Sequence, residues 1–354
     1  MKGLSVLIFS KGYPDNVLRV VRNVYDAADE IIVLDASDRK DNSYLKRAGK
    51  AADLKKMRVL PMIALGYPDP LRMYGIGICR YDWVLLIDTD ELLSDGLKGC
   101  MREVIKGKVH AYALRRYEEV KDLSSMPVFS TWQIRLFRKD CVEFRGLPHE
   151  QPIVSGMLKR LEDSDCYMMH MSSMMSRKTQ FDYGEMEKYE RLTYRMYKEK
   201  MLGYTSKLRT HEDRKASSTL SGRIIGGWMG FYQYITMKKD EQELSGFDYF
   251  LYYSMLDLAY YTLEGNARGI LGIVPNELKH LKRINQWKNS REGRRVFEIS
   301  KIINKVGITK FLGLEKKANV ERLIRKYQYK DGGIGLLFRL INERYDSIKG
   351  AKHG

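Results

Sequence analysis

The sequence predicts an α/β fold: a doubly wound, mostly parallel sheet, followed by an appended C-terminal helical region. Two observations predict the sheet. Four short runs in the first 90 residues are mostly apolar, and helix-like segments separate them, which is typical of parallel strands buried on both faces. A third observation predicts the appended region, because tyrosine-rich and basic helix-like segments replace the strands after about residue 181. We therefore expect one domain over residues 1–180 and a mainly helical region over residues 181–354.

The expected strands are short, mostly apolar runs next to polar or turn residues: Leu4–Ser10, Glu30–Leu34, Met57–Met62 and Trp83–Ile87. The helices between them rest on spacing and turn chemistry. Valines at positions 17, 20, 21 and 24 follow the i, i+3, i+4, i+7 pattern of a helix with one buried face. A basic helix is expected after Asp35, and another over Pro68–Arg80. Further on, Ser130–Lys139 alternates like a strand, Val142–Arg145 is expected to be its return, and Leu336–Ile348 is helix-like.

Composition and charge narrow the class of protein. The net charge is +17; residues 1–180 hold 29 Lys and Arg against 24 Asp and Glu (+5), and the remainder holds 33 against 21 (+12). Such a basic excess suits an anionic membrane surface or a phosphorylated substrate, whereas no nucleic-acid-binding motif is present. No apolar run reaches the length of a membrane span. Four cysteines without CxxC spacing, and no signal peptide, predict a cytoplasmic protein, with the inner face of the cell membrane as a further possibility.

Three carboxylates stand within four positions, at Asp88, Asp90 and Glu91, directly after a predicted strand. Like charges this close raise one another's pKa values unless something neutralises them. Oxygen ligands at the carboxyl end of a parallel strand suit Mg²⁺ or Mn²⁺, which usually also bind substrate phosphates. The alternative is that Asp90 and Glu91 only offset the dipole of the next helix. Because Ser94 and Asp95 already supply cap-type residues there, the metal site is the favoured interpretation.

Three local patterns, in order along the chain, carry a resemblance. They are Ser10-Lys11 after the first strand, ADEIIVLDASD beginning at Ala28, and LIDTDE over Leu86–Glu91. In these patterns the chain resembles the family 2 glycosyltransferases of the GT-A fold, in particular the bacterial and archaeal branch that builds cell-envelope glycans, which has "ADEIVVVDSGS" and "LDADE" segments. The resemblance covers residues 1 to about 180, and it implies that Ser10 and Lys11 line a nucleotide-sugar site.

The resemblance also implies roles for four further residues. Asp88 would touch the donor's ribose or the metal, and Asp90 would ligate the metal directly. Asp35 would accept a hydrogen bond from the donor's base, although a helix-cap or turn aspartate is an equally good reading from sequence. Arg72 stands where the family has an RNxG-like segment. It would contact the base or diphosphate, or else lie on a helix surface.

Two histidines and a glutamate complete the predicted site. The segment from Arg145 to Glu150, RGLPHE, is similar to the branch's G-x-x-H-E turn. Glu150 is the candidate general base that takes the acceptor's hydroxyl proton, and His149 is expected to orient it or bind substrate. The alternative is a structural glutamate paired with an arginine. His170 would complete the metal shell; its alternative is a histidine satisfied within a methionine-rich core.

The resulting hypothesis is an inverting hexosyltransferase-type enzyme that uses Mn²⁺ or Mg²⁺, a nucleotide-diphosphate sugar and a glycan or lipid-linked acceptor. A nucleotidyltransferase would share the sheet and the acids, but SKGYPDN is not the Gly-rich loop expected of it. A non-catalytic basic binding protein explains the charge and leaves the carboxylates unexplained. For the region after residue 181 two interpretations stay open: a helical subdomain that packs on the catalytic domain, or a peripheral membrane surface.

Overall fold

The computed structural model describes residues 2–66, 68–120, 129–146, 151–171, 291–330 and 334–350. Two compact units divide the chain. The first consists mainly of Met1–Gly146, Glu150–Met186 and Ile308–Gly333, and the second mainly of Glu187–Gly307 and Ile334–Gly354. Each is described by itself below. The segment Ile308–Gly333 thus groups with the N-terminal sheet, while the predicted division near residue 180 stays a prediction.

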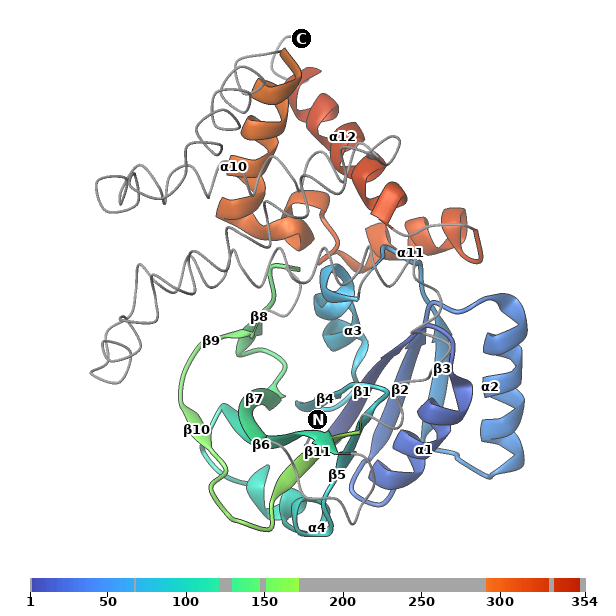
Figure 1. The fold of residues 1–354 in the computed structure, drawn as a ribbon, viewed down its shortest axis with the longest axis vertical. Coiled ribbons are helices and arrows are strands. Elements are labelled where there is room, and N and C mark those ends of the chain that lie inside the picture. Colours follow the sequence, from blue (N-terminus) through green and yellow to red (C-terminus); the bar gives the residue numbers. More distant parts are fainter. Residues whose placement is uncertain are drawn as a thin grey trace, which may run out of the picture. The chain divides into compact units, whose positions relative to one another are not determined.

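A nine-stranded mixed sheet forms the centre of the first unit. Its strands are β1 (Leu4–Ser10), β2 (Glu30–Asp35), β3 (Met57–Pro61), β4 (Trp83–Ile87), β5 (Glu91–Leu93), β6 (Ala111–Val120), β7 (Phe129–Arg138), β10 (Leu158–Arg160) and β11 (Tyr167–Met171). The order is β3-β2-β1-β4-β7-β6-β11-β5, with β10 pairing β6 (Figure 1). β3, β2, β1 and β4 are parallel, and β7 runs antiparallel between β4 and β6. The four strands expected in the first 90 residues are all confirmed.

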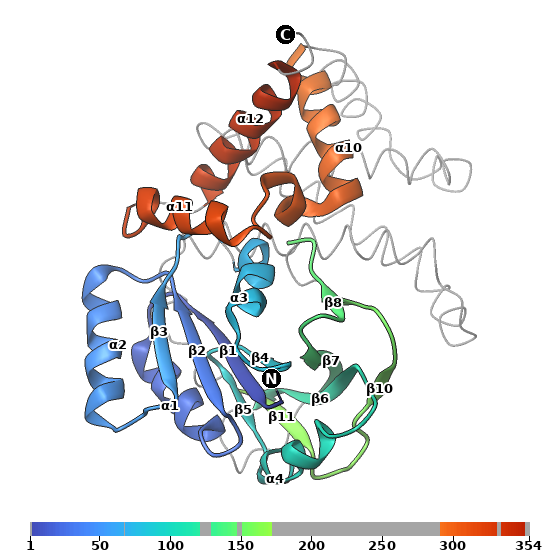
Figure 2. The same cartoon turned by 180° about the vertical axis from the view of Figure 1, so that it is seen from behind.

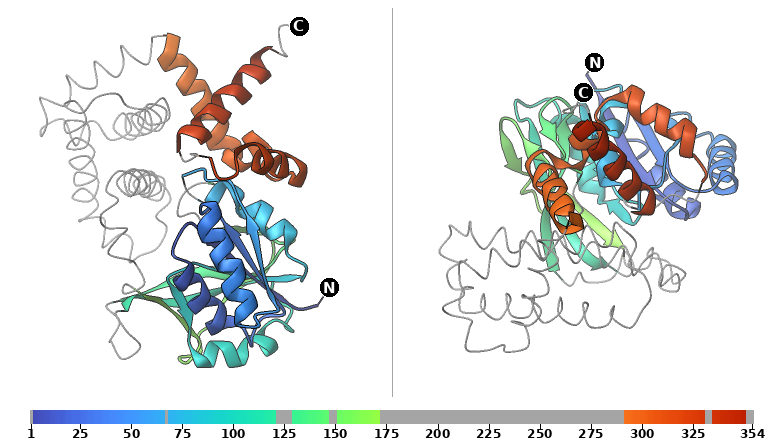
Figure 3. Two further views of the ribbon diagram at one scale, coloured as in Figure 1. Left: turned by 90° about the vertical axis from the view of Figure 1, so that its right-hand side faces the viewer. Right: turned by 90° about the horizontal axis from the view of Figure 1, so that it is seen from above.

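Helices cover both faces of the parallel strands. The elements are α1 (Pro14–Val24), α2 (Arg39–Ala51), the 3-10 turn η1 (Asp69–Leu71), α3 (Arg72–Ile78) and α4 (Asp95–Val104). The buried valines of α1 share a core with Leu4, Val6 and Ile8 of β1. On the other face, a Cβ at Gly75 of α3 would come within 2.9 Å of Leu7. Figures 2 and 3 show α1 and α2 beside the strands. These layers confirm the doubly wound, GT-A type sheet.

One predicted pairing is wrong. Val142–Arg145 was expected to return along the strand that is now β7, but β8 (Val142–Glu143) pairs β9 (Ile153–Val154) in a separate two-stranded sheet. The physical reason is β6, a ten-residue strand that the sequence analysis did not recognise. It pairs along β7 from Ala111 to Glu118 and so occupies the edge that a return strand would need. The helix expected over Pro68–Arg80 is also shorter, as η1 followed by α3.

Three helices are described after residue 290, which confirms a helical C-terminal region: α10 (Arg291–Leu312), α11 (Lys317–Tyr327) and α12 (Ile334–Gly350). Gly307, with φ 81° and ψ 160°, interrupts α10 at the border of the two units. Within the second unit, Arg295 of α10 pairs with Asp346 of α12, with Nη1 and Oδ1 2.8 Å apart. No helix in the described ranges is long and apolar enough to cross a membrane. The helix-like segments expected between residues 181 and 290 lie outside them.

Candidate functional site

The candidate site lies at the carboxyl ends of the parallel strands. Ser10, Asp35 and Asp88 stand at or just after the ends of β1, β2 and β4, which are hydrogen-bonded neighbours in the order β2-β1-β4. Carboxyl ends of parallel strands meet at one edge, and ligands of open α/β sheets bind there. The structure therefore brings three of the predicted residues to the same edge.

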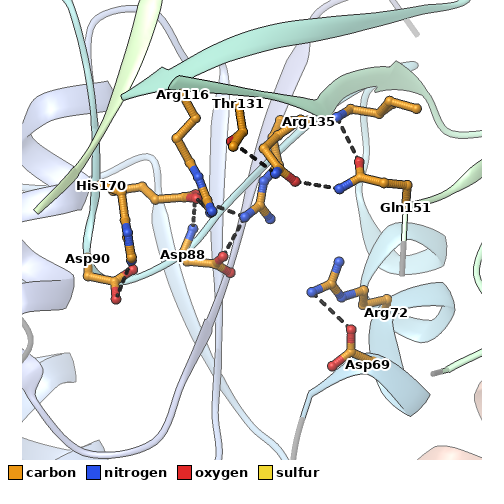
Figure 4. A network of polar contacts seen from close by, with 12 residues as sticks. Asp69, Arg72, Asp88, Asp90, Arg116, Thr131, Arg135, Gln151 and His170 are labelled. Atoms are coloured by element: carbon orange, nitrogen blue, oxygen red, sulfur yellow. Dashed lines mark hydrogen bonds and ion pairs between the residues drawn. The ribbon is translucent and has the colours of Figure 1, made fainter. Parts of the chain in front are cut away.

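Two arginines that the sequence analysis missed neutralise the carboxylate cluster. Arg135 of β7 places its Nη2 atom 2.5 Å from Asp88 Oδ2 and 2.8 Å from Glu91 Oε1. Arg116 of β6 places Nη1 2.8 Å from the same Glu91 oxygen (Figure 4). The other carboxylate oxygen of Glu91 accepts from the backbone N–H of Asp88, at 2.9 Å. Two positive and two negative charges thus balance at the base of the site.

Burial and charge act in opposite directions on these acids. Removal from water raises the pKa of Asp88, but the charges of Arg135 and Arg72 outweigh it and hold the pKa below the usual value. Glu91 is fully buried, and burial leaves its pKa raised despite Arg135 and Arg116. The alternative that Glu91 is a solvated residue of the next helix is wrong, because it begins β5. Ser94 caps α4, accepting from the N–H of Leu97 at 3.1 Å.

Asp90 and His170 lie side by side. β11 runs antiparallel to β5, which sets His170 opposite Glu91, and the backbone N–H of Met171 donates to the carbonyl of Asp90 at 2.7 Å. His170 Nε2 is 3.3 Å from Asp90 Oδ2, and the two side chains are 23% and 24% exposed. His170 therefore faces a carboxylate at an accessible edge instead of being enclosed in a methionine-rich core.

This pair fits a divalent cation. Adjacent ligands of an octahedral ion at about 2.1 Å stand about 3 Å apart, close to the separation of the Asp90 and His170 atoms. Carboxylate and imidazole both suit Mn²⁺. Glu91 is committed to arginines, and Asp88 Oδ2 to Arg135. Among the residues that the structure describes, no group of three or more His, Cys, Asp or Glu could hold an ion, so further positions would fall to substrate phosphates and water.

Asp35 is buried and fully engaged. Its Oδ1 accepts from the backbone N–H of Ser37 at 3.2 Å and from the Ser37 hydroxyl, and its Oδ2 accepts from Asn42 Nδ2 at 3.0 Å. These contacts are those of a turn aspartate, whereas the cap of α2 is Asp38. Ser10 donates its hydroxyl proton to the Gly12 carbonyl at 3.1 Å. A role for Asp35 in base recognition stays a prediction, as does one for Ser10.

Lys11 follows β1 as an exposed residue at the same edge. Its predicted contact with the donor is compatible with this position and stays a prediction.

Arg72, at the start of α3, is largely enclosed instead of lying on a helix surface, so that alternative is wrong. The side chain is 11% exposed, with Nη2 3.1 Å from Asp69 Oδ1. Its guanidinium carbon lies 5.2 Å from the centre of the Phe144 ring, and its buried Nε has no hydrogen-bond partner in the described part of the chain. Figure 4 shows the guanidinium directed toward the space beside Asp88 and Arg135. Positive charge thus faces the acids across the site.

Glu150 and His149, the predicted base and its neighbour, lie outside the described residues. The residue after them is fixed on β7. Gln151 Oε1 accepts from the backbone N–H of Ile134 at 2.9 Å, and its Nε2 donates to Gln133 Oε1. The described chain therefore resumes, at Gln151, next to the strand that carries Arg135.

A signal for Arg135 was present in the sequence. In STWQIRLFRK it stands between Ile134 and Leu136, and an arginine enclosed in a buried strand requires an acid partner. Its partner could not be read from that segment alone, because the acids lie more than forty residues earlier. Arg116 had no such context, since β6 itself was not recognised.

Fold and site together define the class: an α/β domain with an acid–histidine–arginine site at the carboxyl edge of a GT-A type sheet. No family model matches the chain. Proteins named uncharacterized glycosyltransferases from Rickettsia typhi and Rickettsia prowazekii are 33% and 31% identical to it over 98 residues, which is 28% of this chain and 31% of each relative. A third, from Rickettsia bellii, is 34% identical over 97 residues. The match thus spans about a third of the length of these curated relatives.

Two solved structures are also similar to parts of the chain. A 4-diphosphocytidyl-2C-methyl-D-erythritol synthase from Anaerococcus prevotii has a TM-score of 0.34 at 14% identity, covering 54% of this chain and 96% of that one. Residues 1–349 of TarS from S. aureus have a TM-score of 0.34 at 14% identity, covering 76% and 92%. Both scores are below 0.5, and the fold assignment rests on the strand order and layers described above.

Proposed function

We propose that this protein is a glycosyltransferase that moves a hexose-type sugar from a nucleotide-diphosphate donor to a glycan or lipid-linked acceptor, with inversion at the anomeric carbon and with Mn²⁺ or Mg²⁺. The observation that carries the proposal is the Asp90–His170 pair beside Asp88, with Arg72 on the other side of the same space. Similarity to proteins named glycosyltransferases over 98 residues supports the same class. The cell-envelope branch that the sequence motifs resemble suggests the acceptor class.

In this proposal, Asp90 and His170 hold the ion, and Asp88 contacts the donor's ribose or the ion. When bound, the ion supplies neutralising charge to a diphosphate. Arg72 adds a fixed guanidinium on the side of the site facing Asp88. Because Asp69 and Phe144 hold this guanidinium in place, an anion beside it would meet a preorganised charge at little reorganisation cost.

Glu150 is proposed as the general base. Its carboxylate takes the proton from the acceptor hydroxyl as that oxygen bonds to the anomeric carbon, while the bond from that carbon to the donor's phosphate oxygen breaks and a nucleoside diphosphate leaves. Attack from the face opposite the leaving group inverts the centre. His149 is proposed to orient Glu150 or bind substrate.

The metal site is tested by Asp90→Asn, which removes one charge and one ligand with little change of shape. A ligand at one hundred times its Kd stabilises the native state by about 2.7 kcal/mol, which is readily seen as a rise in Tm. We expect the wild type to show such a rise with a nucleoside diphosphate plus Mn²⁺, and Asp90→Asn to show none. The matched control is Asp95→Asn, since Asp95 has a 99% exposed carboxylate. Unchanged Mn²⁺ dependence in Asp90→Asn would overturn the assignment.

The base is tested by Glu150→Gln. Because a general base acts only in the chemical step, we expect kcat to fall by about 10²–10⁴ with donor affinity unchanged. Glu162→Gln, at an exposed position, serves as control. Turnover of Glu150→Gln within a few-fold of wild type would place the base elsewhere.

We also propose that residues after about 181 hold the protein at an anionic membrane surface, since they carry the net charge of +12. Each basic residue near such a surface contributes about 1 kcal/mol. Flotation of the full chain with vesicles of anionic or zwitterionic lipid tests this, and we expect salt-sensitive binding to the anionic ones only. Absence of binding at low salt would contradict it.

A further inference from the structure

A junction of three chain segments lies behind Arg72 in the first unit. Thr309, just after the break in α10, is 2% exposed, and its neighbours Ile308 and Phe311 are 1% and 4% exposed. It belongs to the segment Ile308–Gly333, which returns to the sheet after the whole second unit has intervened. A hydroxyl enclosed among apolar side chains requires hydrogen-bond partners, and those partners show which other parts of the chain this segment contacts.

Thr309 makes hydrogen bonds to two different loops. Its hydroxyl donates to the carbonyl of Pro70 in η1, at 3.2 Å. Its backbone N–H donates to the carbonyl of Arg145, at 3.1 Å. The first loop continues directly into Arg72. The second continues through Gly146 to His149 and Glu150 in the sequence.

The junction leaves no spare room. Gly146 has φ +81°, a conformation that favours glycine. A Cβ added there would meet the Thr309 hydroxyl at 2.6 Å and Pro70 Cα at 2.9 Å. The three segments are therefore in direct contact, and a shift of one displaces the others.

The same two loops also enclose the Arg72 side chain. The Arg72 backbone N–H donates to the Asp69 carbonyl, its guanidinium pairs with Asp69, and it lies over Phe144. Asp69 and Phe144 belong to the η1 loop and to the Arg145 loop, respectively. The position of the guanidinium thus depends on how far apart these loops stand, and Thr309 bridges them.

We propose that Thr309 is a positioning residue for the donor site: by joining the η1 loop to the Arg145 loop, it fixes where Arg72 meets the anionic part of the donor. The identity of the ligand in this proposal rests on the proposed function, whereas the contacts that Thr309 makes do not depend on it. Misplacement by about 1 Å can cost about a hundredfold in activity, so a residue outside the site can control it.

The test uses the full-length chain and two substitutions. Thr309→Val keeps the branched shape and removes the hydroxyl, whereas Thr309→Ser keeps the hydroxyl. The first measurement is calorimetric affinity for nucleoside diphosphates with Mn²⁺, together with KM for the donor and kcat. We expect Thr309→Val to raise Kd and KM about tenfold, and Thr309→Ser to stay within about twofold. Equal Kd and KM in Thr309→Val, with only a lower Tm, would show a purely structural role and overturn the proposal.

The second measurement needs no ligand. Hydrogen exchange of amides in residues 69–74 and 144–146 reports whether the two loops stay joined. We expect Thr309→Val, and not Thr309→Ser, to accelerate exchange in both segments together. If the wild type binds no nucleoside diphosphate, the proposed function fails. The hydrogen-exchange result then still decides whether Thr309 joins the two loops, because unchanged protection in Thr309→Val would show that it does not.

Discussion

Replacing Arg135 by Met is expected to destabilise the protein more than loss of an ordinary ion pair. Arg135 is 7% exposed and makes two charged hydrogen bonds, to Asp88 and to the fully buried Glu91. Hydrogen bonds to charged groups contribute about 1.5–3 kcal/mol each, so the two together give about 3–6 kcal/mol. Breaking a buried pair by removal of one partner costs about 3–5 kcal/mol, which agrees. Methionine fills similar space, so the loss reports charge and not a cavity.

The assay is urea unfolding followed by circular dichroism, with Arg102→Met as the matched control. Arg102 also pairs with a carboxylate, but its side chain is 45% exposed, and we expect a change of at most about 1 kcal/mol. A second variant sharpens the test. In Arg135→Met the cluster keeps both acids and only Arg116, whereas Arg135→Met combined with Glu91→Gln restores charge balance.

The double variant is expected to lose at least about 1.5 kcal/mol less than the sum of the two single losses, which is within the range of coupling between contacting residues. Strict additivity would refute the inference that Arg135 and Glu91 neutralise each other. A loss below about 1 kcal/mol in Arg135→Met would refute it as well.

Three further predictions concern stability. Burial raises the pKa of Asp29, but the hydrogen bond from Arg102 leaves it lowered, so this stabilisation is present above the unfolded pKa of about 3.9 and is lost as the pH falls through the folded value. Unfolding free energies from pH 7 to 3 should fall less steeply in Asp29→Asn. Gly75→Ala should cost about 1–3 kcal/mol in urea melts, because its Cβ would meet three core side chains, whereas Gly77→Ala in the same helix meets nothing and should stabilise by up to about 1 kcal/mol. Ser94→Ala should cost about 1 kcal/mol by removing the cap of α4.

The sequence predicted the parallel half of the sheet well because its signals are local. A run such as Trp83–Ile87 is apolar at every position, and only a strand buried on both faces suits it. The valine spacing of α1 is equally local. Pairing partners are not local, and so β6 was missed and β8 was given the wrong neighbour.

The candidate site shows the same division between residues that local sequence predicts and contacts that it does not. Asp88 and Asp90 stood out because no lysine or arginine stands close to them in the sequence to neutralise their charge. The contact of Asp88 with Arg135 spans 47 residues, and that of Thr309 with Pro70 spans 239 residues. Such contacts are decided by packing, so no pattern within one segment predicts them.

The pairing of β11 with β5 has a consequence for how the Asp90–His170 pair can be altered. His170 stands opposite Glu91, with Met169 opposite Leu92. Sliding β11 by one position along β5 would replace the imidazole opposite Glu91 by a thioether, from Met169 or Met171. A soft sulfur ligand suits Mn²⁺ poorly. Insertion or deletion of one residue in the exposed stretch over residues 162–165 is therefore a way to exchange the proposed imidazole ligand for a thioether without substituting any residue of the site.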